Sequence, residues 1–69
     1  MNLTVELDYH RAPSSVHRVE ADSVDAAISS AIKWAAQIGW TETVKRARII
    51  GPDGYRYTPA RAAKLWGTW

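Results

Sequence analysis

The residues of this chain that could do chemistry are mostly basic or aromatic, and they gather in its last third. Between residues 45 and 66, lysines and arginines are interleaved with tyrosines and a tryptophan. Such groups neutralise phosphates, pair with carboxylates, stack on bases and anchor protein interfaces. The pattern indicates a binding surface for a protein or a nucleic acid; the alternative is an ordinary solvated sheet face. The candidate partner-binding residues are Arg46, Arg48, Tyr55, Arg56, Tyr57, Arg61 and Lys64.

Neither catalysis nor metal binding is indicated by the remaining polar residues. His10 and His17 lack partners at metal-ligand spacing, and the absence of cysteine excludes thiolate zinc sites and disulfides. Ser14 and Ser15 lie near the histidines without a motif that marks a nucleophile. The segment 51–54 is too short for a phosphate-binding loop. We therefore expect a protein that is not an enzyme and holds no cofactor or metal.

Charge is divided unevenly along the 69 residues, although the net charge is only +2. Residues 1–42 hold three bases and six acids, whereas residues 43–69 hold six bases and one acid. This division predicts a surface with two electrostatic ends. Either end could dock: the basic one on acidic side chains or phosphates, or the acidic one, with Glu6, Asp8 and Glu20, on a basic groove.

Elements that would position these residues can be read from periodicity in the first half of the chain. Apolar residues alternate with Thr4, Glu6 and Asp8, which predicts a half-buried strand over 3–9 with an acidic wet face. A turn at 10–15 and a strand at 16–21 complete a hairpin. Asp22 or Ser23 then caps a helix over about 24–38, whose inner stripe is rich in alanine.

The second half predicts another hairpin followed by an ambiguous tail. Strands are expected at 43–50 and 55–58, joined by the turn Gly51-Pro52-Asp53-Gly54. The tail after Thr58 has the pattern of a short helix, with Pro59 in its first position, and the alternative is a last strand over 64–69. Among the tryptophans, we expect Trp34 and Trp40 in the core or at its rim, Trp66 packed and Trp69 partly exposed.

Together these elements predict a single α+β domain over residues 1–69. It would be one antiparallel sheet of four or five strands in the order β-β-α-β-β, with the main helix on one face and the other face open. If Ala47 and Ile49 pack under the helix, Arg46 and Arg48 project from the open face. The opposite register would bury both arginines, which is costly, although the favoured one points Lys45 inward.

Several short stretches resemble a small phage-encoded anti-CRISPR family that inhibits type I Cascade complexes, the nearest in pattern acting on type I-F. They are Val19-Glu20-Ala21-Asp22-Ser23 before an alanine-rich helix, Thr43-Val44-Lys45-Arg46 after it, and Gly54 followed by an aromatic strand and Lys64-x-Trp66. The similarity covers about residues 16–66. The segment 58–63 departs from the family, which continues there as a strand and turn.

The resemblance implies an inhibitor in the host bacterial cytoplasm that binds Cascade backbone subunits along the guide RNA and blocks target-DNA hybridisation. It also implies weak, sequence-independent DNA contact, and the family's basic surface matches best at Arg46 and Lys64. We expect no membrane partner, because no apolar run approaches the roughly 20 residues of a spanning helix, and a monomer or weak homodimer. The alternatives are a small nucleic-acid-binding phage protein and a homo-oligomerising structural or accessory protein.

Overall fold

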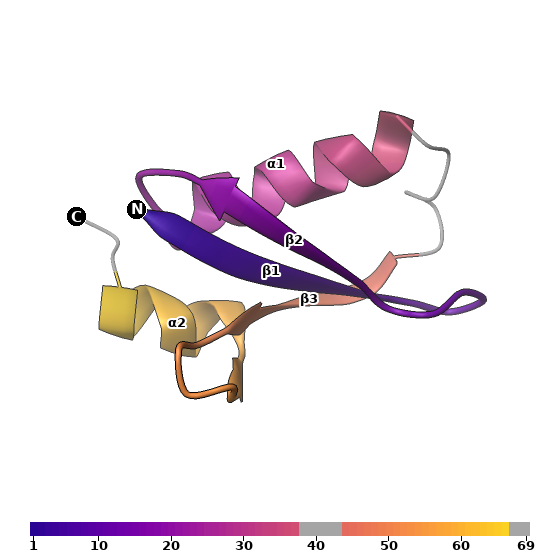
Figure 1. Cartoon of the computed structure of the whole chain (residues 1–69). Helices are drawn as coiled ribbons and strands as arrows, with labels where there is room; N and C mark the ends of the chain where they lie inside the picture. Colours follow the sequence, from indigo (N-terminus) through magenta and orange to yellow (C-terminus); the bar gives the residue numbers. More distant parts are fainter. Residues whose placement is uncertain (38–43, 67–69) are drawn as a thin grey trace.

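The computed structural model describes residues 1–37 and 44–66. Figure 1 shows a curved sheet with a long helix lying across one face and a short helix near one end. None of the described helices is long and apolar enough to cross a membrane. The elements in chain order are β1 (Asn2–Tyr9), β2 (Ser15–Glu20), α1 (Val24–Gln37), β3 (Val44–Ile50), β4 (Arg56–Tyr57) and α2 (Pro59–Trp66).

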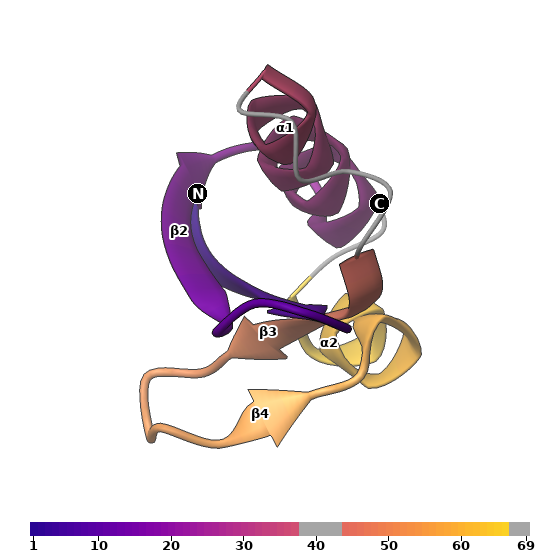
Figure 2. The same cartoon turned by 90° about the vertical axis from the view of Figure 1, so that its right-hand side faces the viewer.

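The four strands form one antiparallel sheet in the order β2-β1-β3-β4, which confirms the predicted α+β fold. β1 is central and pairs with β2 through a hairpin and with β3 through the long connection that contains α1. Figure 2 shows the sheet nearly end-on, with α1 on its concave side. Because β1 pairs on both sides, its register determines which residues of β2 and β3 share each face.

Local signals in the sequence account for the ends of both helices. The Ser23 hydroxyl accepts a hydrogen bond from the backbone N–H of Ala26 at 3.1 Å, so Ser23 caps α1. Thr58 does the same for α2, accepting from the N–H of Arg61 at 3.3 Å, and Pro59 takes the first helical position. The predicted ends 38 and 43, of the helix and the third strand, lie outside the described residues.

The hairpin between β3 and β4 follows the predicted turn, but β4 is shorter than the sequence indicated. Gly54 has a φ of 85°, and its N–H donates to the carbonyl of Gly51 at 2.9 Å. Asp53 Oδ1 accepts from the N–H of Tyr55 at 3.1 Å. Only Arg56 and Tyr57 pair with β3, because Pro59 begins α2 directly afterwards.

The core lies between the sheet and α1, and α2 closes it near the β3–β4 end. The apolar residues of β1 alternate along the strand and are all buried, and the buried residues of α1 are Val24 and three alanines. Alanines let α1 approach the sheet closely. α2 contributes Ala62, and Trp66 packs at the edge of the same core, as predicted. The core members are Leu3, Val5, Leu7, Tyr9, Val24, Ala27, Ala31, Ala35, Ile49 and Ala62.

Three sequence-based expectations need correction. The tail is helical through Trp66, so the alternative of a strand beginning at Lys64 is wrong. Lys45 is exposed, not inward-pointing, because the register between β1 and β3 shifts there and a bulge accommodates the extra residue. Trp34 is 41% exposed, so it is not a core residue. Trp40 and Trp69 lie outside the described residues.

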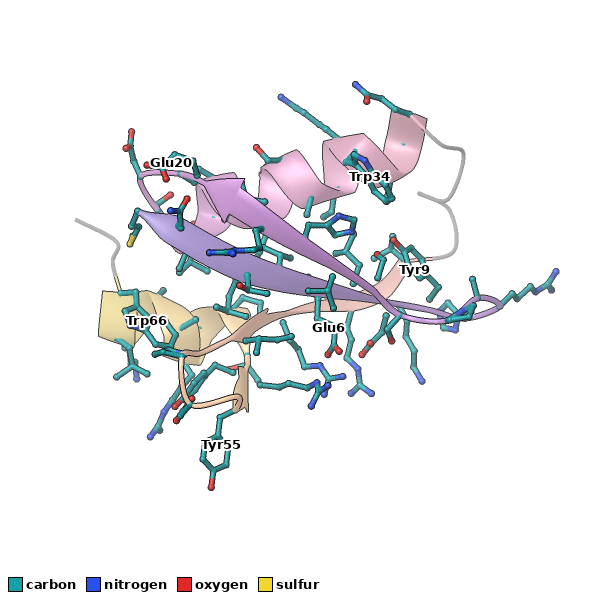
Figure 3. All side chains as sticks on the ribbon, in the orientation of Figure 1. Glu6, Tyr9, Glu20, Trp34, Tyr55 and Trp66 are labelled. Carbon is teal, nitrogen blue, oxygen red and sulfur yellow. The ribbon has the colours of Figure 1, made fainter. Side chains whose placement is uncertain are left out.

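Trp34 instead covers a histidine of the neighbouring strand. Its ring lies 4.3 Å from that of His17, centroid to centroid, and in Figure 3 it points from α1 toward the sheet. His17 Nε2 is 2.8 Å from the Ser15 hydroxyl, which is 2.7 Å from the Tyr9 hydroxyl. Burial lowers the pKa of His17 below its ordinary value of 6.5. The fold therefore favours the neutral imidazole.

This preference predicts a loss of stability between neutral and mildly acidic pH. As the pH falls below about 6.5, the unfolded chain takes up the proton on His17 before the folded chain does, so folding becomes less favourable. We expect a lower melting temperature at pH 5 than at pH 7, and a smaller difference in H17Q. Exposed His10 provides the matched control, since H10Q should keep the wild-type pH dependence. Equal pH dependence in all three proteins would contradict the prediction.

Candidate binding surface on the open sheet face

We call the face of the sheet turned away from α1 the open face. Glu6 and Asp8 of β1 lie on it, directly opposite Arg48 and Arg46 of β3 in the register. Arg56 of β4 joins the same face at one side. The observed register has Ile49 buried, which confirms the prediction that Arg46 and Arg48 project away from the helix. In Figure 3 the Glu6 side chain lies below the sheet, on the side opposite α1.

These five side chains form a continuous arginine–carboxylate cluster. Arg46 Nε donates to Asp8 Oδ2 at 2.8 Å, and Arg48 Nη2 donates to the same oxygen at 2.7 Å. Arg48 Nη2 also lies 3.0 Å from Glu6 Oε1, which accepts from Arg56 Nε at 2.8 Å. Arg48 thus links two carboxylates that lie two residues apart on β1. The cluster connects three strands and fixes the directions of all three guanidinium groups.

The carboxylates are the buried members of the cluster. The Glu6 side chain is only 6% exposed, and Asp8 is also buried, whereas more than half of the Arg46 and Arg56 side-chain surfaces are exposed. Period-two alternation correctly predicted that Glu6 and Asp8 lie on the face of β1 away from the helix. The expectation that this face of β1 is exposed to solvent is wrong. Three arginines from β3 and β4 cover it. Because two carboxylates meet three arginines, the cluster carries one excess positive charge.

Asp8 is held in its ionised form by several donors. Ser14, in the turn after β1, donates to Asp8 Oδ1 at 2.6 Å, and this bond is the largest cause that lowers the pKa of Asp8. Burial acts in the opposite direction, while Arg46 and Arg48 lower the pKa further. Asp8 therefore stays charged wherever the pH exceeds its reduced pKa, and the cluster keeps its geometry there.

The two candidate tyrosines differ in what they offer to a partner. Tyr55 is 69% exposed and, in Figure 3, projects from the β3–β4 hairpin away from the sheet. Tyr57 packs edge-on against Trp66, with ring centroids 5.2 Å apart, and its hydroxyl donates to Asp53 Oδ2 at 3.1 Å. Burial and the contact with Asp53 raise the pKa of Tyr57. Tyr55 can anchor a partner; Tyr57 mainly holds α2 against the hairpin.

Arg61 and Lys64, the remaining candidates, lie on the exposed side of α2, not in the arginine–carboxylate cluster. Their neighbour Leu65 is also exposed, at 51%. The seven predicted partner-binding residues are therefore divided among the open face, the hairpin tip, the core edge and α2. The structure brings together Arg46, Arg48 and Arg56 and leaves Arg61 and Lys64 on a second basic surface.

Chemically, the open face can donate hydrogen bonds from fixed, cationic groups. Guanidinium groups present several N–H donors in a rigid plane, which suits carboxylate or phosphate. Within residues 1–37 and 44–66, no group of three or more His, Asp or Glu residues could hold a metal ion. The buried Arg48 Nε has no hydrogen-bond partner among the described residues. The arrangement therefore holds three guanidinium groups in fixed directions, two of them more than half exposed.

Sequence reasoning identified the arginines but missed their carboxylate partners. A signal was present: Glu6-x-Asp8 and Arg46-x-Arg48 share the period of two residues, so each pair must lie on one face of its strand. Opposite charges on adjacent strands stabilise their pairing. Ser14 had no comparable signal, because its contact depends on how the turn folds back.

Comparisons with models of known protein families, with curated proteins and with solved structures gave no match.

Proposed function

We propose that this chain is a non-enzymatic inhibitor that docks its open face on a type I Cascade complex and blocks the hybridisation of target DNA. One observation carries the proposal: the face away from α1 holds Arg46, Arg48 and Arg56 in fixed directions, and exposed Tyr55 directly precedes Arg56 in the β3–β4 hairpin. Prearranged arginines and an exposed tyrosine are typical of strong protein-binding sites. The resemblance over residues 16–66 supplies the class of partner.

The internal carboxylates favour a protein partner over bare nucleic acid. Glu6 and Asp8 neutralise most of the charge of the three arginines, so the open face attracts phosphates less than an unpaired arginine cluster would. Fixed guanidinium planes can still pair with acidic side chains or with a few guide-RNA phosphates on the Cascade backbone. The acidic docking mode is less favourable, since Glu6 and Asp8 are covered and, of its three residues, Glu20 alone is well exposed.

Capture by purified Cascade tests the proposal directly. The variant Y55A/R56Q removes the exposed ring and one half-exposed arginine of the face. We expect it to bind Cascade about tenfold more weakly than the wild type, or weaker still. Aromatic and arginine side chains in an interface each contribute about 1 kcal/mol or more to the free energy of binding. The companion assay measures target-DNA binding by Cascade with and without the chain.

The matched control is R61Q/K64Q, which removes two exposed charges from α2 and leaves the open face intact. It should be captured like the wild type. Equal loss in both variants would place the docking surface elsewhere or spread it over both basic surfaces. If the wild type neither binds Cascade nor reduces its DNA binding, the proposed function is wrong. Affinity for bare DNA that falls steeply with salt would then support the nucleic-acid-binding alternative.

A further inference from the structure

A second surface, the outer edge of β2, leaves one side of that strand without a neighbouring strand among the described residues. Among the described residues β2 is an outer strand that pairs only with β1. A shallow groove of about 550 Å³ runs along it, bordered by five consecutive residues, 16–20, and by Ser30, Ala31 and Trp34 of α1. An open strand edge beside a groove offers backbone hydrogen bonds and room for alternate side chains.

The register shows which backbone groups face outward. The N–H of Ala21 donates to the carbonyl of Met1 at 2.9 Å, so residues 1 and 21 form a hydrogen-bonded pair. Such pairs alternate along an antiparallel ladder, which directs the backbone groups of residues 15, 17 and 19 toward β1. The N–H and C=O groups of Val16, Arg18 and Glu20 therefore point away from the sheet.

Charge on these same residues selects an occupant. The side chains of Arg18 and Glu20 lie on one face of β2 and are both exposed, Glu20 at 72%. If a second β2 strand pairs antiparallel with Arg18 opposite Glu20 of the other copy, two opposite-charge pairs form at once. The same register pairs outward N–H and C=O groups of both residues and places Val19 beside its own counterpart. The register that pairs Arg18 with itself is disfavoured by like charge.

We propose that the chain self-associates through β2, forming a continuous eight-stranded antiparallel sheet with Arg18 of each copy opposite Glu20 of the other. The contact is short, so association is weak and depends on concentration. The proposal does not rest on the Cascade function, because the arginine–carboxylate cluster lies on β1, β3 and β4, whereas the pairing edge is the outer edge of β2. The variant Y55A/R56Q, which weakens Cascade binding under the proposed function, should self-associate like the wild type.

Charge reversal tests the register, and mixing the variants gives a decisive readout. R18E places glutamate opposite glutamate, and E20R places arginine opposite arginine. We expect each variant alone to self-associate about tenfold or more weakly than the wild type by sedimentation velocity. An equimolar mixture of R18E and E20R restores two opposite-charge pairs and should form a heterodimer. The double variant R18E/E20R should form a homodimer like the wild type.

R11E is the matched control, because it makes the same charge change in the exposed β1–β2 turn. It should associate like the wild type. Circular dichroism and thermal melting of each variant establish that it folds, and the mixture and the double variant remain informative if one single variant is destabilised. A wild type that stays monomeric at the highest attainable concentration overturns the proposal. So does a dimer that neither reversal weakens or that the mixture fails to restore.

Discussion

Replacing Glu6 by alanine is expected to lower the free energy of unfolding by about 2 kcal/mol, because it leaves Arg48 without one of its two carboxylates. The Glu6 side chain is buried; its Oε1 accepts from Arg56 Nε and lies 3.0 Å from Arg48 Nη2. Breaking a fully buried ion pair costs about 3 to 5 kcal/mol. We expect a smaller loss in E6A, because Arg48 and Arg56 are partly exposed and water can hydrate them in the variant. Urea unfolding followed by circular dichroism measures the loss.

The control for this prediction is E20A, which removes an exposed carboxylate from the neighbouring strand. Glu20 lies 3.3 Å from the N-terminal ammonium, and such surface pairs contribute less than about 1 kcal/mol. We therefore expect E20A to stay close to the wild type. If E6A and E20A lose equal stability, the arginine–carboxylate cluster does not stabilise the sheet, and its arginines are held in place by other contacts.

Local patterns in the sequence were sufficient to predict most of the architecture. Alternation along 3–9 gave the two faces of β1, and Ser23 and Thr58 lie where helix-capping residues are expected. The turn 51–54 carries the residues that a tight reversal needs, including Gly54 with positive φ. These features depend on residues close together in the chain, so periodicity and turn chemistry detect them.

What the sequence could not specify depends on contacts between distant segments. Asp8 meets Arg46 from 38 residues away, and Arg56 meets Glu6 from 50 residues away. The bulge at Lys45 follows from fitting β3 to β1, and Trp34 lies outside the core because His17 of β2 lies beneath it. None of these arrangements follows from the type of one residue or from its near neighbours.

Long-range pairing also changes the meaning of the charge asymmetry. An acidic first half and a basic second half were predicted to form two electrostatic ends of the molecule. Instead, β1 and β3 are adjacent, so Glu6 and Asp8 lie under arginines of the basic half. The arginine charges that would attract partners over long distances are partly neutralised by these carboxylates within the sheet. Recognition at the open face then depends on the short-range geometry of the guanidinium groups, more than on net charge.

Replacing Leu7 by alanine is expected to cost about 3 to 4 kcal/mol, the largest effect of any change considered for this chain. Leu7 is fully buried, with 0% exposure, at the centre of the core. The cost of such a cavity depends on how far its surroundings collapse. Much of the core around β1 is alanine, from α1 and α2, and alanine has no rotamers with which to fill the space. We expect the cavity to persist.

A chain of this length has a stability of about 3 to 10 kcal/mol, so L7A should remove a third or more of it and lower the melting temperature by well over ten degrees, roughly. The matched control is L65A on the exposed side of α2, where the same truncation should cost less than about 0.5 kcal/mol. Thermal melting of L7A, L65A and the wild type measures the two losses of stability. Comparable losses would mean that Leu65 is buried in solution, as it would be if α2 packed against a second copy. A small loss in L7A would mean that α1 moves toward β1 and closes the cavity.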